Sequence, residues 1–91
     1  MFVVVTYDIQ DDRRRARVAK RMENYGTRVQ FSVFDCLLDE RRFLEMRLVL
    51  SGLIDPTADS VRLYRLCARC RGQLDVLGAG RIVEDRRVII L

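Results

Sequence analysis

The fold follows from one stretch near the start of the chain, Phe2-Val3-Val4-Val5-Thr6-Tyr7-Asp8-Ile9. Its residues are β-branched or aromatic at almost every position, and both alternating faces of the run are apolar. A run of this kind predicts a central strand that is covered at least in part on each side. Asp11 and Asp12 follow, and an aspartate there can accept hydrogen bonds from the free N–H groups that open a helix. The stretch therefore predicts a strand that leads into a helix.

This helix is predicted to run from about Asp12 to Tyr25. One face carries apolar residues at helical spacing, and the opposite face is basic. Gly26 comes next and is expected to end the helix in the left-handed conformation, which glycine adopts without steric cost. The apolar stripe consists of Ala16, Val18, Ala19, Met22 and Tyr25, and the basic face consists of Arg13, Arg14, Arg17, Lys20 and Arg21.

The following segment, from Arg28 to Leu38, changes its alternation halfway. Val29, Phe31 and Val33 share one face, whereas the apolar positions after them fall on the other. Because a strand has a period of two, a slip of one residue indicates a bulge, a bend or a very tight hairpin near Ser32 and Val33. We expect two short strands that meet there.

A second helix is predicted after Asp39, which is suited to cap it, and should end near Gly52. Its buried stripe would consist of Phe43, Met46, Leu50 and Leu53. Partly alternating residues then predict a strand over 60–67 and a shorter one over 74–77. The closing apolar run, 87–91, needs a sheet edge, and a second protomer would supply it.

The predicted order of elements, strand–helix–strand–strand–helix–strand, is that of a ferredoxin-like α+β sandwich, βαββαβ. Residues 1–91 are expected to form a single domain, because a chain of 91 residues builds one core. Two helices would cover one face of an antiparallel sheet, while apolar side chains on the other face would require a partner. The extra C-terminal strand, about 87–91, is expected to pair with the partner protomer, so the sequence predicts a homodimer.

Composition excludes several classes of protein. Apolar residues make up 49% of the chain and charged residues 33%, which argues against disorder. No apolar run approaches the roughly 20 residues of a membrane span, and no secretory signal is recognisable. Three cysteines, an odd number, are expected of a reducing cytoplasm rather than of a disulfide framework. Cys67 and Cys70 have the spacing of a metal or redox pair, but the lack of histidine leaves a zinc site incomplete, which favours a structural role.

The charge of the chain points to a polyanionic partner. The chain has 17 basic and 13 acidic residues and a net charge of +4, and only one of the basic residues is a lysine, Lys20. Guanidinium groups fork onto phosphate oxygens and stay charged at every relevant pH. An arginine-dominated small domain is therefore typical of a nucleic-acid-binding protein, although an ordinary solvated basic surface has the same composition.

Carboxylates are the remaining candidates for chemistry. Without histidine, the chain cannot use histidine-based acid–base or nucleophilic schemes. No glycine-rich phosphate loop follows the first strand, and the basic–glycine–aromatic signature of RNA-recognition modules is missing. Asp8 stands at the C-terminal end of the predicted central strand, where a magnesium ion could use it together with water and phosphate oxygens. A symmetric pair of protomers would offer two such carboxylates; alternatively, Asp8 caps the turn that follows.

Several motifs together resemble a known family. They are Tyr7-Asp8-Ile9 before Asp11-Asp12 and the arginine helix, the run Tyr25-Gly26-Thr27-Arg28-Val29-Gln30-Phe31-Ser32-Val33-Phe34-Asp35-Cys36, and the closing Val76-Leu77-Gly78. On these residues the chain resembles the CRISPR-associated endonuclease (endoribonuclease) family of the Cas-two type, over nearly its whole length.

The resemblance implies a ferredoxin-like homodimer that cleaves phosphodiester bonds of single-stranded RNA or double-stranded DNA. It also implies the dimeric core of the spacer-acquisition complex of antiviral defence, with a CRISPR integrase subunit as partner. Asp8 matches the catalytic aspartate that binds Mg²⁺, or another divalent cation such as Mn²⁺. Positions tied to cleavage or nucleic-acid contact are matched by Tyr7, Arg15, Arg17, Arg28, Ser32 and Phe34, and the neighbouring Arg13 and Arg14 are expected contacts as well.

Other interpretations of these residues stay open. Tyr7 and Phe34 are alternatively aromatics of the core or of a dimer contact, and the arginines are alternatively a solvated surface. The polar groups of Ser32, at a bend of the chain, are alternatively used in backbone hydrogen bonding. At the level of function, the alternatives to the nuclease are a non-catalytic DNA-binding scaffold of the integrase complex and a small regulatory module that binds a metabolite.

Overall fold

The computed structural model describes residues 1–67, 69, 75, 77 and 78. The order of the elements confirms the predicted ferredoxin-like α+β pattern. The predicted strand over 74–77, Cys70 and the C-terminal strand over 87–91 lie partly or wholly outside the described residues. The elements are β1 (Phe2–Asp8), α1 (Asp12–Met22), β2 (Gly26–Gln30), β3 (Val33–Leu37), α2 (Glu40–Leu53) and β4 (Ser60–Leu66).

The four strands form one sheet in the order β2-β3-β1-β4, with antiparallel pairing between neighbours. Strand β1 lies in the middle, as its composition predicted. Val5 is opposite Phe34 of β3 on one side and opposite Leu63 of β4 on the other. At the end of β1, Asp8 is opposite Ser60 of β4. The last residue of β1 is therefore held in a fixed register at the rim of the sheet.

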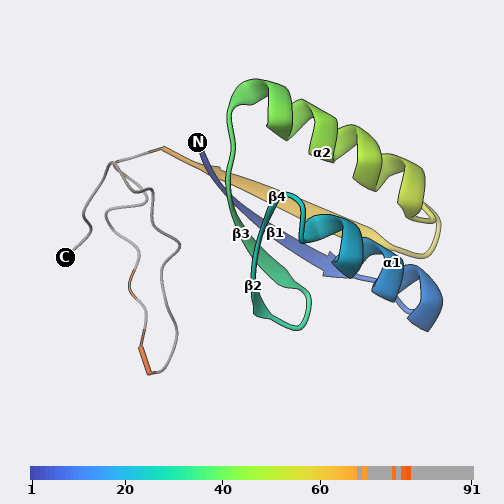
Figure 1. The fold of residues 1–91 in the computed structure, drawn as a ribbon. Coiled ribbons are helices and arrows are strands. Elements are labelled where there is room, and N and C mark those ends of the chain that lie inside the picture. The colour runs from blue at the N-terminus through green and yellow to red at the C-terminus, as the bar shows by residue number, and fades with distance from the viewer. Residues whose placement is uncertain (68, 70–74, 76, 79–91) are drawn as a thin grey trace.

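Both helices cover the same face of the sheet (Figure 1). Val3, Val5 and Tyr7 of β1 are buried in the core beneath them, because alternate residues of a strand point to the same side. The intervening residues of β1 and their partners on β4 point to the opposite side, which we call the second face of the sheet. It includes Val4, Thr6 and Asp8 of β1 and Ser60, Arg62 and Tyr64 of β4. The helical contribution to the core consists of Val18, Met22, Phe43, Met46 and Leu50.

Each helix begins at a capping aspartate. The carboxylate of Asp11 accepts a hydrogen bond of 2.8 Å from the Arg14 backbone N–H, and the carboxylate of Asp39 accepts one of 2.8 Å from the Arg42 backbone N–H. Such caps satisfy N–H groups that have no partner inside the helix and typically stabilise it by about 1 kcal/mol. Both capping positions were predicted. No helix within the described residues has the length and apolar character needed to cross a bilayer.

The prediction for Gly26 is wrong. Helix α1 ends at Met22, and Gly26 begins β2 without a positive φ; among the described residues only Gly78 has one. Glycine is needed at position 26 because the neighbouring strand comes too close for a side chain. A Cβ atom there would lie 2.4 Å from the Asp35 carbonyl oxygen and 2.5 Å from Cys36 Sγ. The requirement is therefore for space between β2 and β3 rather than for backbone freedom.

The two short strands expected after Arg28 are present as a hairpin. Strands β2 and β3 meet at residues 31–32, and the pairing shifts its register between Arg28 and Gln30. The alternation of the sequence breaks where the chain turns between the two strands, and the apolar residues before that turn, Val29 and Phe31, are exposed rather than part of a buried face. The hairpin turn lies beside the end of β1 that carries Asp8 (Figure 1).

Gly26→Ala is expected to lower the free energy of unfolding by about 1–3 kcal/mol, because a well-packed strand pair must move to admit the methyl group. Gly52→Ala is the matched control, since a Cβ atom at this helical position meets nothing within 4 Å. That substitution should leave the stability unchanged or raise it by up to about 1 kcal/mol. Urea unfolding curves of both variants test this, and equal stability of the two would refute the close approach at Gly26.

Candidate functional site

Asp8 lines a hollow on the second face of the sheet. Its side chain is exposed, and the described residues that line the hollow of about 300 Å³ belong to β1 and β4. Because both strands are fixed by their pairing, the polar groups of this hollow are held on a rigid support. The lining residues are Thr6, Tyr7, Asp8, Ser60, Arg62 and Tyr64.

The sequence analysis did not identify the β4 side of this hollow. Arg62 is exposed, and its Nη1 lies 3.5 Å from the hydroxyl oxygen of Tyr64, the acceptor of its hydrogen bond. This hydrogen bond raises the pKa of Arg62 above its usual value, so the guanidinium stays charged. The alternation of Ser60, Arg62 and Tyr64 along one strand was visible in the sequence. What was missing was the register that places them beside Asp8.

Tyr7 and Phe34 lie in the core, as one of their two interpretations proposed. Both residues are buried, and their ring centroids are 6.3 Å apart with an interplanar angle of 27°. The Tyr7 hydroxyl donates a hydrogen bond of 3.3 Å to the Phe31 carbonyl oxygen. Packing of this kind fixes the orientation of the β1 end. The nucleic-acid role expected of these two residues stays a prediction.

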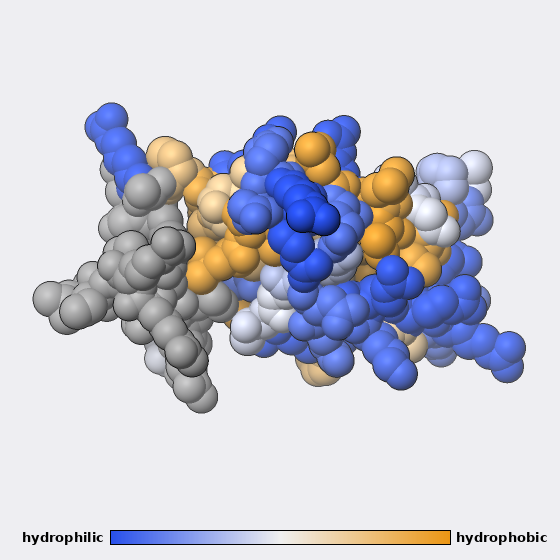
Figure 2. All heavy atoms as spheres, turned by 45° about the horizontal axis from the view of Figure 1, so that its top comes forward, coloured by the Kyte–Doolittle hydropathy of each residue, from blue (hydrophilic) through white to orange (hydrophobic). Residues whose placement is uncertain are grey.

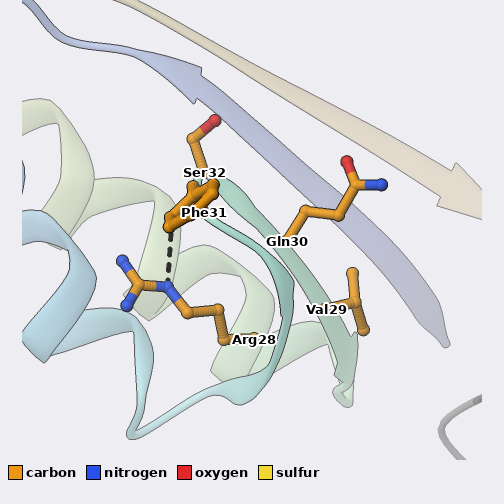
Figure 3. Close-up of a pocket in the computed structure, with 5 residues that line it drawn as sticks. All are labelled: Arg28, Val29, Gln30, Phe31 and Ser32. Atoms are coloured by element: carbon orange, nitrogen blue, oxygen red, sulfur yellow. Dashed lines mark hydrogen bonds between the residues drawn. The ribbon is translucent and has the colours of Figure 1, made fainter. Parts of the chain in front are cut away.

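The β2–β3 turn is tied to the end of β1 by backbone hydrogen bonds. The Tyr7 N–H donates to the Ser32 carbonyl oxygen at 3.1 Å, which agrees with the backbone interpretation of Ser32. Figure 3 shows Arg28 reaching along the turn, where its Nε donates a hydrogen bond of 3.1 Å to the Phe31 carbonyl oxygen. The Arg28 guanidinium carbon also lies 5.8 Å from the centroid of the Phe34 ring. Arg28 is therefore oriented by the turn while its side chain remains exposed.

Phe31 is a second residue that the sequence analysis misplaced. It was assigned to the apolar face of a strand, whereas the structure places it in the hairpin turn with 92% of its surface exposed. It lines, with Arg28, Val29, Gln30 and Ser32, a shallow hollow of about 680 Å³ (Figure 3). Val29 is exposed as well, so the apolar alternation of this segment did not mark a buried face of β2.

The arginines of α1 fall into two groups. Arg13 and Arg17 are exposed, and neither takes part in an ion pair within the described part of the chain. Arg15 Nη2 lies 2.5 Å from Asp12 Oδ1, and its Nη1 donates to the Ile9 carbonyl oxygen at 2.9 Å. Arg15 thus spans the link between β1 and α1. Among the described residues, the arginines of α1 that are exposed and take part in no ion pair are therefore Arg13, Arg17 and Arg21.

Arg14 forms the structural ion pair of the domain. Its Nε and Nη2 donate to the two carboxylate oxygens of Asp59 at 2.5 and 2.9 Å, and the Asp59 side chain has no exposed surface. Asp59 Oδ2 also accepts a hydrogen bond of 2.8 Å from the Asp55 backbone N–H. The hydrogen bonds from Arg14, opposed by burial, hold the pKa of Asp59 below its usual range. This pair connects α1 to the loop between α2 and β4.

The surface over the helices is mainly hydrophilic, with apolar side chains among the charged ones (Figure 2). Lys20 and Arg21 extend the exposed basic face of α1, and Leu44 and Leu48 are exposed on α2. The basic face predicted from the sequence is therefore present on the molecule. The charges of this face are spread along α1 and do not gather around one pocket.

A metal site formed by one protomer alone is not present in the described part of the chain. No group of three His, Cys, Asp or Glu side chains is placed there to hold an ion. Asp8 offers a single carboxylate, which suits magnesium because this ion takes one or two protein carboxylates and completes its shell with water and phosphate. Cys36 is buried, and burial together with the charge of Asp35 raises the pKa of its thiol to about 12. Its thiol therefore stays protonated at neutral pH.

Sheet order, helix placement and the carboxylate at the rim of the central strand together define a ferredoxin-like domain. The chain belongs to the family described as CRISPR associated protein Cas2, whose model matches residues 1–74. This membership confirms the resemblance seen in the sequence motifs.

Similar proteins match along almost the whole chain. A relative from Chloroflexus aurantiacus, named CRISPR-associated endoribonuclease Cas2 1, is 46% identical over 100% of this chain and 99% of its own. A relative from Thermus thermophilus, named CRISPR-associated endonuclease Cas2 2, is 44% identical over 96% of this chain and 92% of its own. The crystal structure of Streptococcus pyogenes Cas2 superposes with a TM-score of 0.75 at 36% identity, covering 86% of this chain and 100% of that one.

Asp59→Asn is expected to lower the melting temperature at pH 7 by several degrees and to make stability less dependent on acid pH. The lowered pKa of Asp59 contributes stability above the ordinary carboxyl pKa of about 3.9, and this contribution is lost as the pH falls through the folded value. Thermal unfolding between about pH 7 and about pH 2 measures both effects. Asp12→Asn, at an exposed ion pair with a carboxylate that is 88% exposed, is the control and should change little. Equal behaviour of the two variants would contradict the structural role of the Arg14–Asp59 pair.

Proposed function

We propose that this chain is a metal-dependent endonuclease of CRISPR adaptation that hydrolyses phosphodiester bonds of single-stranded RNA or double-stranded DNA. The observation that carries the proposal is the exposed Asp8 carboxylate at the end of the central strand, in a hollow that also contains an arginine. Membership of the Cas2 family supports it, because relatives at 44–46% identity are named endonuclease and endoribonuclease.

Mg²⁺, or Mn²⁺ in its place, is the proposed cofactor, and Asp8 is the residue that would hold it. The exposure of Asp8 fits this role, since most of the ion's ligands must come from water and the phosphate group. When bound, such an ion lowers the pKa of water and offsets charge on the scissile phosphate. The contribution of the protein is to hold the carboxylate at a fixed point, which the pairing of Asp8 with Ser60 provides.

We further propose that the active form is a homodimer. The second face of the sheet presents Val4, Thr6 and Asp8 along β1, and neither α1 nor α2 covers it. Two copies that meet through this face would bring together two Asp8 carboxylates, one from each protomer. A symmetric arrangement would thus supply the second acidic ligand that one protomer lacks.

The proposed contacts to the nucleic-acid backbone come from the exposed arginines. Arg13, Arg17 and Arg28 have exposed side chains that can fork onto phosphate oxygens, and such contacts fix the position of the strand without reading its sequence. The guanidinium groups of Arg14 and Arg15 are bound by Asp59 and Asp12, which suits a supporting role next to the free ones. A strong decrease of affinity with salt concentration is expected for this surface.

One observation favours a second candidate function. Asp8 is the one carboxylate among the described residues that line the hollow. A site with one carboxylate in each protomer also suits a non-catalytic scaffold that binds duplex DNA and the integrase subunit. In that function the arginines act as in the nuclease, while Asp8 contributes nothing to chemistry. Cleavage that depends on Asp8 and on the metal separates the two functions.

Asp8→Asn is expected to reduce Mg²⁺-dependent cleavage of single-stranded RNA or duplex DNA by at least about 100-fold, because the amide cannot hold the ion and a lost electrostatic contact in a site costs that much. Purified wild type and variant are compared with Mg²⁺ and with chelator. Glu23→Gln, an exposed carboxylate next to the end of α1, is the control and should cleave like wild type. Undiminished cleavage by Asp8→Asn would exclude the nuclease proposal, and DNA binding without any cleavage by wild type would favour the scaffold.

A further inference from the structure

Asp8 and Arg62 line the same hollow from neighbouring strands. Asp8 is opposite Ser60, and Arg62 is opposite Thr6, so the two charged residues form a diagonal pair on the second face of the sheet. Side chains in such a diagonal relation start about 7–8 Å apart, within reach of a long side chain. The carboxylate and the guanidinium are nevertheless not an ion pair within 4.0 Å. The hollow between them is about 300 Å³, which leaves space for a phosphate group.

The positive charge of Arg62 is not balanced by an acidic side chain of the described residues. Within the described residues Arg62 belongs to no ion pair, and it donates a hydrogen bond of 3.5 Å to the neutral hydroxyl of Tyr64. Arg65, on the other face of the same strand, differs in this respect. It lies 4.0 Å from Glu40, and its guanidinium carbon is 4.6 Å from the centroid of the Phe43 ring. One arginine of β4 is thus occupied by packing, whereas the other lines the hollow of Asp8 and belongs to no ion pair within the described residues.

We propose that Arg62 binds a non-bridging oxygen of the scissile phosphodiester and stabilises the negative charge that develops there during hydrolysis. The inference rests on the nuclease function proposed for Asp8 and adds a second catalytic residue to that site. In the reaction, the oxygen of water bonds to phosphorus while the bond to the leaving oxygen breaks. A proton of the water is released and the leaving oxygen takes up a proton through solvent. Arg62 keeps its own protons throughout.

The chemistry of arginine suits this position. A planar guanidinium donates two parallel hydrogen bonds to a phosphate and remains protonated, so it can offset charge without exchanging a proton. A donor that is already in place where charge develops lowers the barrier more than one that must be recruited. Strand β4 is paired with β1 along its whole length, and the Tyr64 hydroxyl restricts the guanidinium further. Tyr64 is therefore a positioning residue for Arg62.

Cleavage kinetics under single-turnover conditions test the proposal. Arg62→Ala should slow Mg²⁺-dependent cleavage by about 100-fold or more, since that is the usual cost of removing one charge-stabilising donor. Arg62→Lys should recover part of the rate, because it keeps the charge but not the fork. Guanidinium ion added to Arg62→Ala should restore activity in a concentration-dependent way. A purely structural role would not give this rescue.

A second readout does not depend on cleavage. A fluorescein-labelled single-stranded oligonucleotide is titrated with protein in EDTA at several salt concentrations. Loss of one phosphate contact in Arg62→Ala should reduce the slope of log affinity against log salt by about 1. Arg47→Ala, which removes an exposed arginine from α2, is the matched control and should leave cleavage unchanged. Circular dichroism verifies that each variant is folded.

The outcomes separate this inference from the function on which it rests. If Asp8→Asn loses cleavage while Arg62→Ala cleaves at the wild-type rate, the role of Arg62 is overturned and the nuclease proposal stands. If Asp8→Asn cleaves normally, the nuclease proposal fails whatever Arg62 does. If wild type cleaves nothing, the salt slope decides: a reduced slope in Arg62→Ala supports the phosphate contact, and an unchanged slope refutes it.

Discussion

Strand β1 is paired along both of its edges, with β3 on one side and β4 on the other, and the rest of the structure depends on this double pairing. Its register turns Val3, Val5 and Tyr7 toward the helices and leaves the alternate residues on the second face. A slip by one residue would exchange the two sets and expose the core, so the register is strongly determined. The position of Asp8 is a consequence of that hydrophobic constraint.

The fold uses some of its many arginines and leaves others available. Arg14 is bound by a carboxylate without exposed surface, and Arg65 lies over an aromatic ring of α2, so both belong to the architecture. Arg13 and Arg17 carry exposed charge, and Arg62 lines the hollow of Asp8. A net charge of +4 therefore says little about which residues meet a polyanion. For each arginine, the neighbouring charges and the burial of its side chain decide whether it is available to a polyanion.

Much of the fold could be predicted because its signals are local. The caps at Asp11 and Asp39 are set by hydrogen bonds to residues three positions away, and the hairpin was visible as a break in alternation. The end of the first helix was misjudged at Gly26, whose constraint comes from Asp35 and Cys36 across the sheet. Of the residues that line the hollow, the sequence identified only Tyr7 and Asp8, since the other side is contributed by a strand more than fifty residues later.

By itself, the sequence determined the order of the elements, the central position of β1 and the carboxylate at its end, since apolar periodicity and capping act over a few residues. Only the tertiary structure decided that Arg14 is paired with Asp59, 45 positions away, and that Arg62 lines the same hollow as Asp8. Both arrangements depend on which strands and helices become neighbours and in what register. That choice is made by burial of the whole core, and no single segment of the chain contains it.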